Sequence, residues 1–205
     1  MLERKGIMNN DRDDPNFRLN IEKIRANWSV NSDIELCAMF DKHNRFIGFN
    51  IGKEHEVDTL YLQGSLAGGT TIHNHPTTQD RPLGLSFSRD DFKSFLHEGT
   101  RRFEATAREG TYSMTTKGRV RFSQKDYDEL FDRWNDIKAA TEDAFRQRGI
   151  STSSDIYWRV RAIDHHKVIQ EFAQKHGFTY KFTPRKGYEK LMDVSQIDKP
   201  LPKFK

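Results

Sequence analysis

Two histidines separated by one residue follow a short β-prone stretch, residues 70–72, and Pro76 comes directly after them. Alternate side chains of a β-strand face the same side, so His73 and His75 can reach one metal ion from the end of a strand. Pro76 lacks a backbone N–H and ends the strand. A catalytic zinc ion takes about three protein ligands and keeps one open position, so a third ligand must come from another segment.

A carboxylate in the first turn of the following helix is well placed to be that ligand. Ser88 has the character of a helix N-cap, and Asp91 is predicted to face the strand end, with Asp90 as the alternative. Metal-activated water also needs a carboxylate that takes its proton. Glu35, on the first predicted strand, is the candidate general base. Each residue alone also fits a surface or capping role, and it is their combination that indicates a site.

These residues carry a resemblance to a known family. Glu35, the tetrapeptide HNHP from His73 and the tetrapeptide SRDD from Ser88 resemble the signature of the JAB/MPN (JAMM) metallopeptidase superfamily, whose pattern is Glu, then His-x-His-Pro, then Ser-x-x-Asp. HNHP and SRDD are most similar to its RadC-like bacterial and phage branch. The resemblance covers residues 32–114.

The resemblance implies a zinc-dependent hydrolase of peptide or isopeptide bonds. His73, His75 and Asp91 would bind one Zn²⁺ ion per chain, Glu35 would be the acid/base, and Ser88 would support the developing oxyanion. The implied partner is a peptide or protein substrate, such as a ubiquitin-like conjugate. The implied fold is α/β, a mixed β-sheet flanked by helices with JAB/MPN-like, cytidine-deaminase-like layering and an added C-terminal helical pair.

The loop of residues 77–87 is longer than the family pattern and leaves two points open. It is either a lip that selects the substrate or an insertion without a role. It also contains Asp80, which competes with Asp91 as the residue that closes the site.

The elements that must position these residues follow from turn chemistry and periodicity. Asp41 to Asn44 separate two β-prone stretches, which predicts an antiparallel hairpin. Spacings of three and four between apolar residues predict two long helices near the C-terminus. The expected elements are strands at 34–40, 45–51, 70–72, 102–107 and 111–116, a helix from Ser88, and helices at 124–148 and 154–176.

We expect a polar N-terminal arm at 1–31, a metal-site domain at 32–123, an accessory helical region at 124–177 and a basic tail at 178–205. The net charge of +4 resides in the last of these segments, which we expect to be solvated and partly disordered. The histidines outside the motif are expected at the surface: His43, His55, His97, His165, His166 and His176.

The single cysteine, Cys37, lies in an apolar stretch and is expected to be a buried thiol. A single buried thiol, with no secretion signal and no membrane span expected, predicts a cytoplasmic protein. Two functional alternatives to the hydrolase stay open. One is a binding or structural module of the same fold, such as a phage or mobile-element protein, and the other is a protein that acts on nucleic acid through its basic tail.

Overall fold

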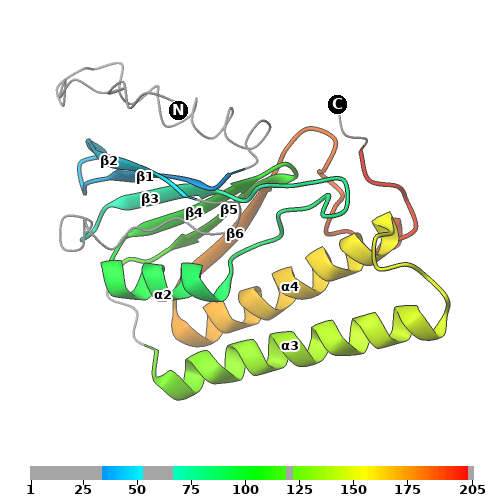
Figure 1. Ribbon diagram of the computed structural model, residues 1–205. Coiled ribbons are helices and arrows are strands. Elements are labelled where there is room, and N and C mark those ends of the chain that lie inside the picture. The colour runs from blue at the N-terminus through cyan, green and yellow to red at the C-terminus, as the bar shows by residue number, and fades with distance from the viewer. Residues whose placement is uncertain (1–33, 53–66, 119–121, 203–205) are drawn as a thin grey trace.

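The computed structural model describes residues 34–52, 67–118 and 122–202. Within them, six strands form one sheet in the order β2-β1-β3-β4-β5-β6 (Figure 1). The β3–β4 pair is parallel and the other neighbouring strands are antiparallel, so the predicted α/β fold with a mixed sheet is confirmed. The strands are β1 (Leu36–Phe40), β2 (Phe46–Ile51), β3 (Thr70–Asn74), β4 (Arg102–Ala107), β5 (Gly110–Thr115) and β6 (Thr179–Pro184). The predicted arm, residues 1–31, lies outside the described residues.

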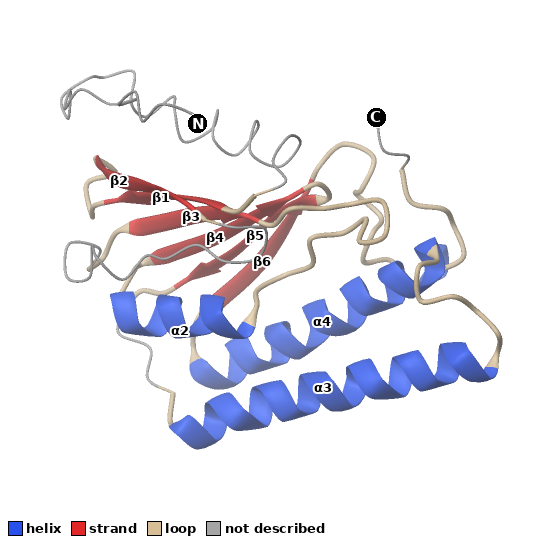
Figure 2. Ribbon diagram, in the orientation of Figure 1, coloured by secondary structure: helices blue, strands red, loops and turns tan. Residues whose placement is uncertain are grey.

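Three helices of the described chain lie on one face of the sheet (Figure 2): α2 (Arg89–Glu98), α3 (Gln124–Gln147) and α4 (Asp155–His176). Each begins at a serine whose hydroxyl accepts a backbone N–H, at Ser88, Ser123 and Ser154. Such caps satisfy N–H groups that have no partner inside the helix. The predicted helices near the C-terminus are therefore confirmed. No helix among the described residues is long and apolar enough to span a bilayer.

The predicted hairpin forms from β1 and β2, joined by residues 41–45. The Asp41 carboxylate accepts the backbone N–H groups of His43 and Arg45, and Asn44 takes the left-handed conformation, with φ of 62°. Asparagine tolerates that conformation better than most residues, which explains how the turn closes. A short 3₁₀ helix, η2 (Val194–Gln196), follows β6.

Aromatic side chains fill the core between the sheet and the helices. The ring of Phe92, on α2, lies edge-on to the rings of Phe87, Phe131, Phe172 and Phe178, with centroids 6.0–6.4 Å apart. One hydrophobic cluster includes side chains of α2, β4, β5, α3, α4 and β6. The helices that we expected as an accessory region thus share a core with β4 and β5, two strands of the metal-site domain expected at 32–123.

The C-terminal segment differs from the solvated tail that we expected. Residues 179–184 form β6, which pairs in register with β5 from Tyr112 opposite Phe182 to Met114 opposite Tyr180. Leu191 and Leu201 are buried beside α4. The net positive charge misled the prediction, because alternate aromatic residues in this segment face the core while its lysines stay in solvent.

A buried arginine holds the end of this segment against α4. Arg159 donates from Nη1 to the carbonyl of Lys190 and from Nη2 to the carbonyl of Lys199, at 3.2 and 3.3 Å. These bonds satisfy carbonyl groups that a chain without regular structure would otherwise leave buried and unpaired.

Candidate metal centre

The end of β3 brings His73 and Glu35 to the same side of the sheet. In the antiparallel β1–β3 pair, Cys37 lies opposite His73, so Glu35, two residues before Cys37, reaches the neighbourhood of His75. His73 pairs with Ala105 of β4, which lies in the core under the helices, so Glu35 and His75, two positions along from the Cys37–His73 pair, also lie on the face that the helices cover. The pairing thus joins two segments that are 38 residues apart in the chain.

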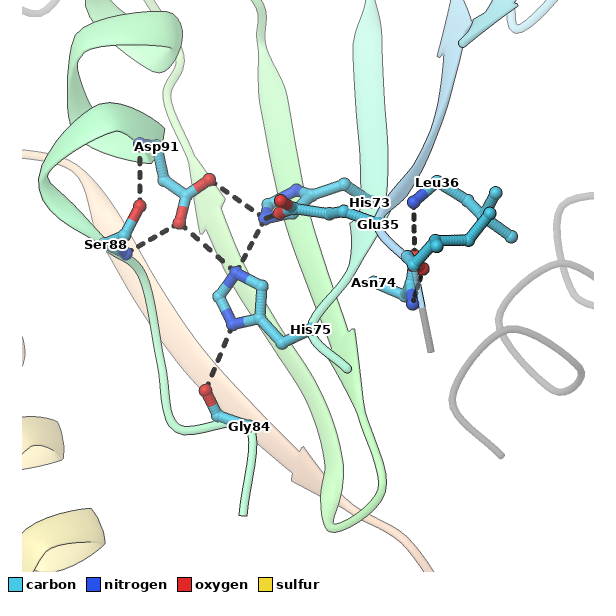
Figure 3. A network of polar contacts seen from close by, with 9 residues as sticks. Glu35, Leu36, His73, Asn74, His75, Gly84, Ser88 and Asp91 are labelled. Atoms are coloured by element: carbon cyan, nitrogen blue, oxygen red, sulfur yellow. Dashed lines mark hydrogen bonds and ion pairs between the residues drawn. The ribbon is translucent and has the colours of Figure 1, made fainter. Parts of the chain in front are cut away.

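Asn74 fixes the backbone on both sides of Glu35. Its Oδ1 accepts the Leu36 N–H at 2.6 Å, and its Nδ2 donates to the Ile34 carbonyl at 3.1 Å (Figure 3). The side chain of Asn74 faces away from those of the two histidines because it alternates with them along the strand. It therefore positions the glutamate without entering the site.

The four polar groups converge, as Figure 3 shows. One ligand atom from each of Glu35, His73, His75 and Asp91 lies within 4.8 Å of all the others, and the four residues are buried. His73 Nε2 is 2.9 Å from His75 Nε2 and 2.9 Å from Asp91 Oδ1, and His75 Nε2 is 3.3 Å from Asp91 Oδ2. Glu35 Oε1 is farther away, 3.9 Å from His73 Nε2. This group could hold a metal ion.

The spacing of the donor atoms fits a small divalent cation. Ligands on a tetrahedral zinc ion, with bonds of about 2.0–2.1 Å, lie about 3.3 Å apart. The distances among His73, His75 and Asp91 come close to this value, whereas the carboxylate of Glu35 is set back. Two imidazoles and a carboxylate are also a donor set that zinc accepts in catalytic sites.

A capping box aims the carboxylate of Asp91. The Ser88 hydroxyl accepts the Asp91 N–H at 3.2 Å, and Asp91 Oδ2 accepts the Ser88 N–H at 2.6 Å. These two bonds fix the aspartate against the first turn of α2 and leave Oδ1 facing His73. Burial by itself would raise the pKa of the Asp91 carboxyl, but the charges and hydrogen bonds of His73 and His75 hold that pKa well below its usual value.

The carbonyl of Gly84 orients the second histidine. It lies 3.2 Å from His75 Nδ1 and can only accept, so Nδ1 donates to it and Nε2 is the ring nitrogen that faces the site. A Cβ at Gly84 would come within 2.8 Å of the His75 Cβ and 2.7 Å of the Ala107 Cβ. Only glycine therefore allows this close approach of the loop.

A buried glutamate, Glu109, holds the loop in place. Its carboxylate accepts the N–H groups of Gly84 and Leu85, at 3.1 and 2.9 Å, and the hydroxyl of Tyr112 at 3.0 Å. Leu85 has a φ of 60°, a backbone conformation that residues other than glycine rarely adopt, and these bonds hold Leu85 in that conformation. Burial raises the pKa of the Glu109 carboxyl, and the hydrogen bonds it accepts oppose that rise. The loop at 83–87 is thus part of the packed interior.

The structure brings together the predicted Glu35, His73, His75 and Asp91 and leaves out both alternative aspartates. Asp90 is exposed and pairs with Lys93, and Asp80 is exposed in the loop. Ser88 lies at the start of α2, beside Asp91, with its side chain in the capping box.

Sequence reasoning missed Asn74 as a positioning residue and missed Glu109 entirely. The HNHP motif contained a signal for Asn74, since a polar residue between two strand histidines must face the opposite side of the sheet. Glu109 had no such signal because an acidic residue in a tight turn is ordinarily solvated. It is fully buried here.

The prediction that His165 is a surface residue was wrong. It is 1% exposed and stacks on Trp134, with ring centroids 3.6 Å apart. Burial lowers its pKa well below the usual value, and repulsion from Arg161 and His75 acts in the same direction. His165 is therefore packed within the core, against α3.

Comparisons of the chain with protein-family models, curated proteins and solved structures find no match. The geometry of the site and the sequence resemblance therefore carry the functional argument.

Proposed function

We propose that the protein is a zinc-dependent hydrolase of peptide or isopeptide bonds, of the JAB/MPN type that its sequence resembles. The observation that carries this proposal is the convergence of His73, His75 and Asp91 on one point, with the carboxylate of Glu35 set back from it. Three ligands and a separate carboxylate are the parts that a hydrolytic zinc site requires. Along the chain, α2 connects β3 to its parallel neighbour β4, and this connection supports the JAB/MPN-like layering.

When bound, the zinc ion supplies Lewis acidity, which polarises the scissile carbonyl and lowers the pKa of water. Glu35 takes the proton of the water molecule that attacks the carbonyl carbon and delivers it to the leaving amine. Its position 3.9 Å from His73 Nε2, beyond the distances among the other ligands, leaves room for this role. The Ser88 hydroxyl, which accepts from Asp91 N–H, still has its own hydrogen to donate to the oxyanion.

The complete ligand set favours the hydrolase over a module that lacks metal. A buried cluster of two histidines and two carboxylates is costly to assemble unless the groups are paired or bind a cation. A purely structural module would need no carboxylate set back from the other three. The alternative of a nucleic-acid partner stays a prediction, with salt-dependent DNA binding as its test.

Metal content and activity of matched variants test the proposal. Wild type should hold about one zinc ion per chain by elemental analysis, and His73→Ala, His75→Ala and Asp91→Ala should lose it. Glu35→Gln should keep the metal, while its turnover in a screen of peptides and isopeptide conjugates falls by about 10²-fold or more.

Asp90→Ala is the matched control, since it removes the neighbouring exposed aspartate. It should keep both the zinc and the activity. If folded wild type takes up no zinc when the ion is supplied, the hydrolase proposal is overturned and the binding module is the remaining alternative.

A further inference from the structure

A groove of about 1010 Å³ lies beside the loop that orients His75. It is lined by Asp80, Arg81 and Leu85 of the loop, by residues of the second half of α3 and the first turns of α4, and by the connection between these helices. Leu85 lines it, and the adjacent Gly84 bonds to His75. One short loop thus forms both a wall of the groove and a support of the metal centre.

Two buried hydrogen-bond donors on α4 belong to the wall of this groove. Arg161 is 4% exposed, and its Nη1 has no hydrogen-bond partner among the described residues; the same is true of the buried Nε1 of Trp158. The two residues are three apart and lie on the same side of the helix. Buried donors nearly always have an acceptor, so two adjacent donors without one indicate an acceptor that binds from outside.

The charges around the groove favour an anionic acceptor. Four cationic side chains line it, against two carboxylates. One of these carboxylates, Glu142, already accepts the Tyr157 hydroxyl at 3.1 Å and lies 3.9 Å from Lys138 Nζ. The guanidinium of Arg161 already interacts with the charges of Glu142 and Asp164 and with the Tyr157 hydroxyl, so a bound anion would pair with its remaining donor, Nη1.

The same charges favour a single carboxylate over a chain of phosphates. Asp80 and Glu142 stand on the walls, and they would repel a nucleic-acid backbone that filled the groove. A polypeptide can present one acidic side chain to the two donors and neutral residues elsewhere. Hydroxyl groups of residues 151–153 offer further hydrogen bonds to its backbone.

We propose that this groove binds an acidic side chain of a polypeptide, with the Arg161 guanidinium and the Trp158 indole N–H as donors. That this polypeptide is the substrate of the metal centre rests on the proposed hydrolase; the binding itself does not. The hydrolase would then prefer chains with an acidic residue at a set distance from the scissile bond.

Binding of labelled peptides to full-length Glu35→Gln protein, measured by fluorescence anisotropy, tests the assignment without turnover. The probes are a set of decapeptides with one glutamate at each successive position, and the same peptides with glutamine there. The best glutamate peptide should bind about tenfold tighter than its glutamine match, because a hydrogen-bonded charge is lost in the latter. Adding Trp158→Phe or Arg161→Met should each remove most of that preference.

Arg133→Gln is the control, because Arg133 is an exposed residue of α3 that pairs with Glu171 of α4 and does not line the groove. It should leave the preference unchanged. If Arg161→Met fails to fold, Trp158→Phe decides, since it removes the indole N–H and keeps a smaller aromatic ring at that position.

Equal affinity for glutamate and glutamine peptides would overturn the proposal, as would a preference that survives both groove variants. If a short oligothymidylate binds more tightly than any peptide and loses affinity in the same variants, the ligand of the groove is a phosphate and not a carboxylate. Wild-type assays separate the two proposals. Zinc-dependent hydrolysis with equal kcat/KM for both peptide sets overturns the groove alone, whereas glutamate-dependent binding without zinc uptake overturns the hydrolase alone.

Discussion

At the scale of single residues, Asp91 belongs to two structures at once. One carboxylate oxygen accepts the Ser88 N–H and caps α2, and the other faces His73. The aspartate is therefore held by helix formation before any metal binds. Such preorganisation lowers the cost of placing a ligand in the correct geometry.

Replacing the two capping serines tests this double role. Ser88→Ala and Ser123→Ala each remove a hydroxyl from a capping box, so each should lower the free energy of unfolding by about 1 kcal/mol in chemical denaturation. Only Ser88→Ala should also weaken zinc binding and hydrolysis, because Ser88 both fixes Asp91 and supplies the proposed oxyanion donor. Equal zinc affinity and turnover in the two variants would show that the cap and the site are independent.

At the scale of elements, the loop after β3 connects the site to the sheet. Gly84 bonds to His75, and Glu109, at the turn between β4 and β5, binds the N–H groups of Gly84 and Leu85. The strands thus position the second histidine through a carboxylate that is itself outside the ligand set. Partners of this kind orient a metal-binding imidazole as firmly as the strand that carries it.

Glu109→Gln should lower the zinc affinity about 10- to 100-fold, measured by competition with a chelating dye. A glutamine offers one acceptor oxygen in place of two, and its NH₂ group would face a backbone N–H. Glu104→Gln is the control, because it changes a buried carboxylate on β4 that alternates with Phe103 and Ala105 and so faces away from the helices. A similar loss of affinity in both variants would assign the effect to general destabilisation.

At the scale of the whole molecule, one hydrophobic cluster joins the three helices, strands of the sheet and the C-terminal segment. Phe178 and Tyr180 belong to the same cluster as Phe92 on α2, and the Tyr180 hydroxyl donates to Ser86 Oγ in the loop at 2.8 Å. The segment that follows α4 therefore contacts the loop that orients His75.

A chain that ends at Gly177 should lose its cooperative thermal transition, followed by circular dichroism. It lacks β6, exposes the edge of β5 and uncovers side chains of both clusters. A chain that ends at Pro202 keeps these contacts and should unfold as wild type does. A cooperative transition at the wild-type temperature in the shorter chain would instead support the independent metal-site domain expected at 32–123.

Local patterns in the sequence determined much of this protein. The turn at Asp41 predicted the β1–β2 hairpin, Ser88 and Ser154 marked the starts of two helices, and the apolar spacing predicted α3 and α4. The alternation of His73 and His75 also predicted that both face one side of a strand. Each of these inferences depends on residues that lie within a few positions of one another, where hydrogen bonding and periodicity are set by the chain itself.

Only the tertiary structure decided which distant groups meet. The approach of Glu35 to His73 depends on the β1–β3 register, the support from Glu109 depends on a buried turn, and the burial of His165 depends on how α4 packs against the sheet. The type of a charged or polar residue does not indicate whether its side chain is solvated or buried. Its environment comes from the packing of segments that are far apart in the chain, and local residue patterns do not encode that packing.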